Sequence, residues 1–494
     1  MGAKTEAANR YIRQNKHRLN DQYRLQYHFM GEYGWINDPN GFIQYRGRYH
    51  LFYQHYPYGP VWGPMHWGHA VSEDLVTWSY LPVALAPDRA YDQDGCFSGS
   101  AIEKDGRLYL LYTGHVLTGS GPDEYRQTQN VACSDEGFVF AKLPVNPVID
   151  IAQIPPNASK QDFRDPKVFQ SGAHYYLVIG SNDCRRDGQV LLYRSPDLLN
   201  WEFVNVLAKG EGRLGSNWEC PDLFRLGGRD VLLVSAQHVG GDALHNLHSA
   251  VALTGKADLA KGVFETDDFQ ALDDGFDFYA PQTTLDDKGR RLVVAWMDMW
   301  ESAEPTRTWG HHWAGAMTLP REMILKDGRL CFKPIREIEK YRRNPSAWHD
   351  VGLDGEIELE TGGDSYELQV TFEAGTAVEF GLKLRANETE ETVLAYDRAQ
   401  KMFRLNRDRS GRGPKGERRS AADLADNRLE LRIFVDRCSV EVFIGEGVKV
   451  MTARIYPGRR ATRVKLFSKG PCTVRSLRKW DIVTRTIGQG EERR

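Results

Sequence analysis

Five short motifs, each built around a tight turn, recur over the first two thirds of the chain. They begin at residues 38, 98, 165, 221 and 281, which gives steps of 60, 67, 56 and 60 residues. A second motif, Ser-x-Asp-Leu-x-x-Trp, occurs at 72–78 and at 195–201, with a weaker copy that begins at Ser134. A repeat of this length predicts a several-strand unit that is copied along the chain and packs against its neighbours.

Each of the five motifs is followed by an apolar stretch that is typical of a β-strand after a tight turn. These stretches lie at 48–53, 107–112, 174–179, 230–234 and 291–296. A β-sandwich would not need the same strand-initial motif five times, whereas a β-propeller needs one in every blade. We therefore expect an all-β protein that begins with a five-bladed β-propeller.

The pattern changes after the fifth copy of the repeat. A short basic stretch is followed by alternating apolar and polar residues, as in Glu356–Glu360. Alternation over many short segments predicts antiparallel sheets with one buried face, as in a β-sandwich. The expected domains are an N-terminal helical extension at 1–24 with its helix at 7–19, the propeller at 25–335, a linker at 336–349, a C-terminal β-sandwich at 350–485 and a polar tail at 486–494.

The composition argues against several classes of partner. The chain of 494 residues has 64 Lys and Arg against 67 Asp and Glu, a formal charge of -3, which favours neither nucleic acid nor an anionic membrane. It has no apolar run of the roughly 20 residues that a membrane helix needs, and residues 1–24 lack the apolar core of a signal peptide. Seven scattered cysteines without a Cys-x-x-Cys pair are typical of reduced thiols. We expect a cytoplasmic protein, and the sequence carries no signal for its oligomeric state.

Three acidic residues lie at or just before the starts of the repeated motifs. Asp38 opens the first motif, Asp165 opens the third, and Glu219 lies two residues before the fourth. If the motifs open the innermost strand of each blade, these three side chains converge at one end of the central channel. Crowded carboxylates raise one another's pKa, and two acids with separated pKa values are what glycosidic bond cleavage requires. Taken singly, each acid could equally cap a blade turn.

Residues beside the acids have the chemistry of a sugar-binding pocket. Aromatic rings stack on the apolar faces of sugars, amides bond sugar hydroxyl groups, and an arginine directly precedes Asp165. The histidines have no zinc-type spacing. We expect no metal and no organic cofactor. The expected substrate-binding residues are Asn37, Gln54, Trp62, Phe97, Ser98, Arg164 and Trp296.

Four segments of the chain together resemble glycoside hydrolase family 32, the β-fructofuranosidases. They are Trp35–Gly41, Phe97–Ser100, Phe163–Pro166 and Trp218–Asp222. Segments 65–69 and 91–96 look most like the bacterial sucrose and sucrose-6-phosphate hydrolases of that family, and the similarity runs from about residue 27 to about residue 480. The approach at 30–32 differs, since many relatives are proline-rich there, and this leaves the shape of the pocket rim open.

The resemblance implies a role for each of the three acids. Asp38 would be the nucleophile, Glu219 the general acid and base, and Asp165, together with Arg164, the group that stabilises the transition state. The implied reaction is retaining hydrolysis of the terminal β-D-fructofuranosyl bond of sucrose, sucrose-6-phosphate or short fructo-oligosaccharides, through a fructosyl-enzyme. The expected partner is therefore a small carbohydrate.

Several alternatives stay open at this point. A five-bladed arabinosidase or xylosidase would also use three propeller carboxylates, and a comparison of pentosides with sucrose as substrates separates it from an invertase. A fructosyltransferase would share every catalytic residue, and a sugar-binding propeller without activity would lack one of the acids. Recognition of a 6-phosphate would need a cation, for which Arg185, Arg186 and Arg307 are candidates.

Overall fold

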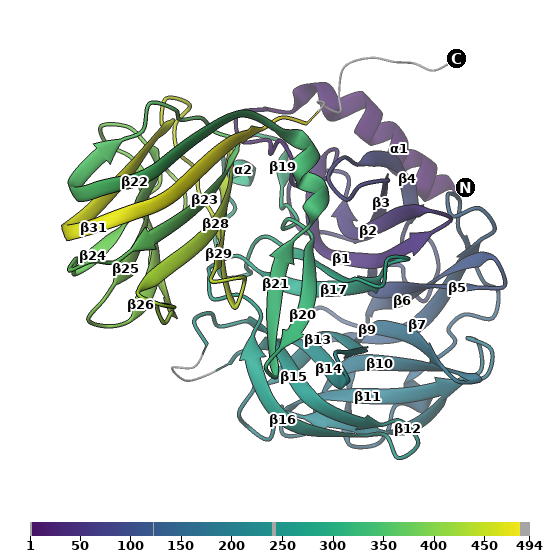
Figure 1. Ribbon diagram of the computed structural model, residues 1–494. Coiled ribbons are helices and arrows are strands. Elements are labelled where there is room, and N and C mark those ends of the chain that lie inside the picture. Colours follow the sequence, from purple (N-terminus) through teal and green to yellow (C-terminus); the bar gives the residue numbers. More distant parts are fainter. Residues whose placement is uncertain (1, 122, 240–243, 485–494) are drawn as a thin grey trace.

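The computed structural model describes residues 2–121, 123–239 and 244–484 and contains two β-rich domains (Figure 1). The purple, blue and teal strands, with the green β20 and β21, form one group of sheets, and the strands from β22 to the yellow β31 form a second domain at its side. The Ser-x-Asp-Leu motif makes the same turn twice, because the hydroxyls of Ser72 and Ser195 accept hydrogen bonds from the backbone N–H of Leu75 (2.7 Å) and Leu198 (3.0 Å). The sequence repeat is therefore also a repeat of structure.

Five antiparallel sheets form the blades of the propeller, and each blade begins with an inner strand. The blades are β1 (Gly34–Tyr45), β2 (Arg48–Tyr56), β3 (His66–Ser72) and β4 (Ser79–Leu85); β5 (Gly95–Lys104), β6 (Arg107–Leu117), β7 (Tyr125–Ser134) and β8 (Ala141–Lys142); β9 (Ala158–Ser171), β10 (His174–Asp183), β11 (Gly188–Ser195) and β12 (Glu202–Lys209); β13 (Asn217–Leu226), β14 (Arg229–Gln237), β15 (Ser249–Asp258) and β16 (Val263–Ala271); and β17 (Tyr279–Leu285), β18 (Arg291–Trp296), β20 (Arg321–Lys326) and β21 (Arg329–Pro334).

The inner strands close into a ring. β1 contacts β5, β5 contacts β9, β9 contacts β13, β13 contacts β17, and β17 returns to β1. A short strand within the fifth unit, β19 (Trp313–Ala314), pairs in parallel with the start of β1, where Gly34 lies opposite Trp313. This pairing joins the last blade to the first. The five-bladed propeller expected from the repeat is confirmed.

The second domain is a sheet of ten strands that encloses its own core. The longest strand, β31, pairs with β24 through its first half and with β23 through its second half, so it takes part in both layers. Phe372, Phe380 and Val440 belong to the single core between the layers. This arrangement confirms the expected C-terminal β-sandwich. Its strands are β22 (Arg342–Glu358), β23 (Tyr366–Glu373), β24 (Glu379–Ala386), β25 (Glu391–Asp397), β26 (Met402–Arg409), β27 (Glu417–Ala421), β28 (Arg428–Asp436), β29 (Ser439–Ile444), β30 (Lys449–Arg454) and β31 (Arg463–Ile482).

Helices are few and short in the described part of the chain. They are α1 (Ala3–Asn15), α2 (Pro305–Thr308) and the 3-10 helices η1 (Lys16–Arg18), η2 (Ile151–Gln153) and η3 (Arg336–Tyr341). Helix α1 begins and ends four residues before the expected 7–19, and its buried Ala8 and Ile12 pack against Val83 of the first blade. None of these helices is long and apolar enough to cross a membrane.

The stretch 336–349, expected as a linker, consists of η3 and the first part of β22. Its basic residues are used in packing: the guanidinium of Arg342 lies 4.2 Å from the ring centre of Trp480 and pairs with Glu367 (2.7 Å). The chain therefore passes from the propeller into the sandwich without an extended connector. The tail expected at 486–494 lies outside the described residues.

A buried cluster of charges joins the two domains. Glu441 of β29 accepts hydrogen bonds from Arg321 of β20 (2.5 Å) and contacts a ring nitrogen of His28 (2.9 Å), and all three side chains are fully buried. Burial opposes the ionisation of Glu441, but the charge of Arg321 and the contact with His28 outweigh burial and lower its pKa to about 2. Glu441 is therefore ionised at neutral pH, and its charge is compensated by Arg321.

Replacing Arg321 by methionine should lower the free energy of unfolding by about 3–5 kcal/mol, because it leaves Asp273 buried without its cation and leaves Glu441 with His28 alone. Urea unfolding followed by tryptophan fluorescence measures the change. Lys326→Met is the matched control, since Lys326 lies on the same strand and pairs with Glu446 at the surface, so its loss should leave unfolding nearly unchanged. Equal losses in the two variants would contradict the role given to Arg321.

Candidate active site

The inner strand of every blade carries a β-bulge. The pairing register shifts near the start of β1, β5, β13 and β17 and at the corresponding place in β9, and β1 and β9 each have a second shift. A bulge bends the strand and redirects the side chain at that point, and it tolerates proline because the ladder bond is already missing. Three residues at these bulges have a positive φ, and each directly precedes a proline: Asp165 (64°), Cys220 (48°) and Ala280 (50°). The turn-like motifs of the sequence are therefore β-bulges that set the direction of the side chains at the starts of the inner strands.

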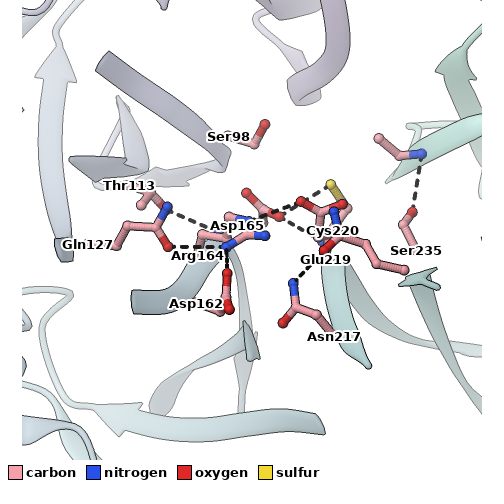
Figure 2. Close-up of polar contacts among 12 residues, drawn as sticks. Ser98, Thr113, Gln127, Asp162, Arg164, Asp165, Asn217, Glu219, Cys220 and Ser235 are labelled. Carbon is pink, nitrogen blue, oxygen red and sulfur yellow. Dashed lines mark hydrogen bonds and ion pairs between the residues drawn. The ribbon is translucent and has the colours of Figure 1, made fainter. Parts of the chain in front are cut away.

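The bulges bring the three expected acids to one cavity of about 400 Å³. The thiol of Cys220 lies 3.7 Å from Oδ2 of Asp38 and 3.5 Å from Oδ2 of Asp165, and its backbone N–H donates to the same oxygen of Asp165 (2.9 Å). Cys220 directly follows Glu219, so the acids of three different blades meet around one residue. Figure 2 shows Asp165, Glu219 and Cys220 side by side.

Asp38 is held in one orientation by its neighbours. The hydroxyl of Ser98 donates to Oδ2 of Asp38 (2.6 Å), and the amide of Asn37 donates to Oδ1 (2.9 Å). The indole N–H of Trp35 in turn fixes Asn37 through its amide oxygen (2.8 Å). Trp35, which precedes the first motif, thus helps to orient Asp38 through Asn37.

Both oxygens of Glu219 accept hydrogen bonds. Arg164 Nε donates to Oε1 (3.0 Å), and the phenol of Tyr279 donates to Oε2 (2.7 Å). Arg164 also donates to Asp162 (2.6 Å), and Figure 2 shows its guanidinium between these two acids. These contacts select one rotamer of Glu219 and direct its carboxyl group at the cavity.

Burial shifts the pKa of two of the acids. Burial, with smaller contributions from Glu219 and Asp38 and against the opposing charge of Arg164, raises the pKa of Asp165 to about 7. Burial, and to a lesser degree the charge of Glu219, also raises the pKa of Asp38. A cluster of this kind can hold a proton and present a carboxylate near neutral pH, which acid–base cleavage of a glycosidic bond requires.

Most of the residues expected to bind substrate line the cavity, and one does not. Trp296 is 1% exposed and lies under Trp300, with the ring centres 4.8 Å apart, while Trp300 is 39% exposed and forms part of the wall. The aromatic wall thus comes from the loop after β18 and not from the strand itself. The expected residues in the lining are Asn37, Asp38, Gln54, Trp62, Phe97, Ser98, Arg164, Asp165 and Glu219.

Several residues of the cavity wall were not predicted from the sequence. They lie on the second or third strand of a blade or in loops, where no repeated motif marks them. His115 of β6, for example, stacks on Phe97 with ring centres 4.2 Å apart. Tyr279 could have been found, because it precedes the fifth motif at the place that Glu219 holds before the fourth. The missed lining residues are His115, Leu117, Tyr125, Gln127, Gln237, His248 and Trp300.

Two further features of the described residues bear on chemistry. No group of three or more His, Cys, Asp or Glu side chains within 2–121, 123–239 and 244–484 is arranged to hold a metal ion. The seven cysteines are all free thiols.

Comparison with known proteins decides the family. Residues 28–334 match the Glycosyl hydrolases family 32 N-terminal domain, and residues 337–481 match the Glycosyl hydrolases family 32 C terminal domain. The chain belongs to glycosyl hydrolase family 32. The resemblance read from the motifs is confirmed, and so is the expectation that the chain is a glycoside hydrolase.

Relatives of this family 32 chain match it over nearly its full length. A sucrose-6-phosphate hydrolase of Zymomonas mobilis is 40% identical over 94% of each chain, and a raffinose invertase of Escherichia coli is 40% identical over 90% of this chain and 91% of its own. Among structures, a Bombyx mori β-fructofuranosidase mutant in complex with sucrose is 36% identical and has a TM-score of 0.85, covering 97% of this chain and 99% of its own. The match therefore extends over both domains.

Proposed function

We propose that this family 32 hydrolase is a β-fructofuranosidase that releases fructose from sucrose with retention of configuration. Asp38 attacks the anomeric carbon of the fructosyl unit, and Glu219 protonates the departing oxygen. Glu219 then activates a water molecule that hydrolyses the fructosyl-enzyme, while Asp165 stabilises the positive charge that develops on the ring. The observation that carries this assignment is the meeting of the three carboxylates around Cys220 in one cavity.

The restraints on the two reacting acids support their different roles. Asp38, fixed by Ser98 and Asn37, is rigid in the way that a nucleophile held at attack distance must be. Glu219, held by Arg164 and Tyr279, has donors on both oxygens that can stay in place while its proton comes and goes. Family membership argues against an arabinosidase, a xylosidase or a merely sugar-binding propeller.

A substrate panel tests the proposal. The purified enzyme should release glucose and fructose from sucrose and fructose from raffinose, and it should leave aryl arabinosides and xylosides intact. The same chromatograms detect transfer of fructose to sugar acceptors, which would use the same catalytic residues and would appear as trisaccharide at high sucrose. Cleavage of the pentosides without cleavage of sucrose would contradict the proposal.

The charges around the cavity favour sucrose over its 6-phosphate. Among the described lining residues the only lysine or arginine is Arg164, which already donates to Glu219 and Asp162. Burial, and then the charge of Arg164, lower the pKa of His115 to about 4, and burial lowers the pKa of His248, so both rings are neutral at pH 7. The candidate cations Arg185, Arg186 and Arg307 are not in the lining, and Arg186 pairs with Asp123 (3.6 Å).

The kcat/KM for sucrose should therefore exceed that for sucrose-6-phosphate by at least about tenfold, since the phosphate would lose hydration without gaining the hydrogen bond of about 1.5–3 kcal/mol that a cation would supply. Leu117, a half-exposed residue of the rim, offers a matched pair of variants. Leu117→Arg should raise the ratio for the phosphorylated sugar, and Leu117→Gln should not. A wild-type preference for sucrose-6-phosphate would overturn this assignment while leaving the catalytic roles intact.

The proposed location of the enzyme is the cytoplasm. The support is the set of seven free thiols, which suits a reducing compartment.

A further inference from the structure

Two loops of the cavity wall face the sandwich domain. One carries Trp300 and follows β18, and the other carries His248 and precedes β15. The loops are joined, because Glu301 accepts a hydrogen bond from the backbone N–H of His248 (2.9 Å). The sandwich reaches the second loop as well: Arg418 of β27 donates to the side chain of Asn246 (2.7 Å). Residues of the second domain are thus in contact with the wall of the cavity.

Arg454 of β30 makes the main contact with the Trp300 loop. Its guanidinium donates to Asp298 and to Glu304 (3.4 Å), and all three side chains are at least nine-tenths buried. Its backbone N–H donates to Asp277 of the propeller (2.7 Å), which fixes the strand end itself. Asp298 lies two residues before Trp300 and Glu304 four residues after it. Arg454 of the sandwich therefore contacts both ends of the segment 298–304.

The position of Trp300 depends on this attachment. Its ring lies nearly parallel to that of Trp35, at 22° with centres 6.3 Å apart, and over Trp296. Within the described chain, the ion pairs of Asp298 and Glu304 are those with Arg454. Removal of one partner from a buried charge cluster leaves uncompensated charge behind. Burial, and then the charge of Glu304, raise the pKa of Asp298, and Arg454 is the cation that opposes this rise. Without Arg454 the two carboxyl groups would take up a proton or draw in water, and the segment between them would lose its fixed path.

We infer that the sandwich domain contributes to the active site. Its Arg454 is a positioning residue that holds Trp300 in the cavity wall, where the ring can contact the substrate. The kinetic part of this inference rests on the proposed sucrose hydrolysis, whereas the structural part does not. Because a misplacement of about 1 Å can cost about 10²-fold in rate, a residue that touches no substrate can still matter this much.

A double-mutant cycle tests the inference. Arg454→Met and Trp300→Ala should each lower kcat/KM for sucrose by about 10–100-fold, whereas Arg454→Met should change it less than about threefold when Trp300→Ala is already present. Arg454→Lys should recover part of the loss, because it restores the charge. If Arg454→Met does not fold, Glu304→Gln, which removes one anchor, takes its place in the cycle with a smaller expected loss.

Hydrogen exchange gives a readout that needs no activity. Arg454→Met should speed amide exchange in 298–304 at least about tenfold. Arg290→Met also removes a buried arginine, but one that pairs with Asp286 and Glu337, so it should leave both exchange in 298–304 and kcat/KM unchanged. Additive losses in the cycle, or unchanged exchange in 298–304, would overturn the inference. A wild-type enzyme that does not cleave sucrose would instead refute the proposed function, and the exchange result would still decide whether Arg454 holds the segment.

Discussion

Replacing Asp38 by asparagine should lower kcat for sucrose by on the order of 10⁴–10⁶-fold, the range seen when a nucleophile that acts in a covalent mechanism is removed. The covalent path is then closed, so an activated fructoside with a nitrophenyl leaving group should not restore turnover. Steady-state release of glucose from sucrose and of nitrophenol from the activated fructoside measures both effects.

The thermal stability of Asp38→Asn shows whether the loss of activity comes from misfolding. Burial raises the pKa of Asp38, so its ionised form costs stability in the folded state at every pH above the usual aspartate pKa. Asparagine removes that cost and can still accept the hydrogen bond from Ser98. The melting temperature should therefore stay the same or rise while activity is lost. A large fall in melting temperature would mean that the loss of activity reports misfolding, and retained activity on the activated fructoside would rule out a nucleophilic role.

Replacing Glu219 by glutamine should lower kcat/KM for sucrose by about 10²–10⁴-fold, the usual contribution of a general acid or base. The loss should shrink for the nitrophenyl fructoside, because that leaving group departs without a proton. The second step stays slow, since no base activates water, and azide should rescue Glu219→Ala by intercepting the fructosyl-enzyme as a β-fructosyl azide. If Asp38→Asn responds to azide and to the leaving group in the same way, the two roles are wrongly assigned.

Glu219→Gln should also change the pH dependence of kcat/KM. The charge of Glu219 raises the pKa of both Asp38 and Asp165, although burial is the larger cause for each. Glutamine removes that charge, so both aspartates should ionise at lower pH than in the wild type. The acid limb of the pH profile of kcat/KM, measured with the nitrophenyl fructoside, should shift to lower pH. A shift to higher pH would contradict the electrostatic coupling of the three acids.

The fold and the acids of the site could be predicted because they are tied to a repeat. Each motif marks a bulge at the same place in an inner strand, and five copies at similar spacing fix the number of blades. Asp38 and Asp165 open their motifs and Glu219 lies two residues before its own, so the ring of inner strands brings them together even though 127 and 54 residues separate them along the chain. Periodicity and local chemistry were sufficient here.

The wall of the pocket could not be predicted in the same way. Trp296 and Trp300 lie in one short stretch of sequence, and only the path of the loop decides which of them is buried and which faces the cavity. The two carboxyl groups that flank this loop, Asp298 and Glu304, contact Arg454, which lies at least 150 residues away in another domain. Nor does the sequence pattern indicate that Arg185, Arg186 and Arg307 lie outside the cavity lining. Long-range contacts of this kind leave no local signal.

The stereochemistry of transfer to methanol tests the central claim most directly. In a double displacement through a fructosyl-Asp38 intermediate, methanol replaces water in the second step and the product keeps the configuration of the substrate. Methyl glycosides do not mutarotate, so NMR of the isolated product gives a permanent record of that step. The account predicts methyl β-D-fructofuranoside from sucrose in methanol–water mixtures, and methyl α-D-fructofuranoside would contradict it by removing Asp38 as the nucleophile.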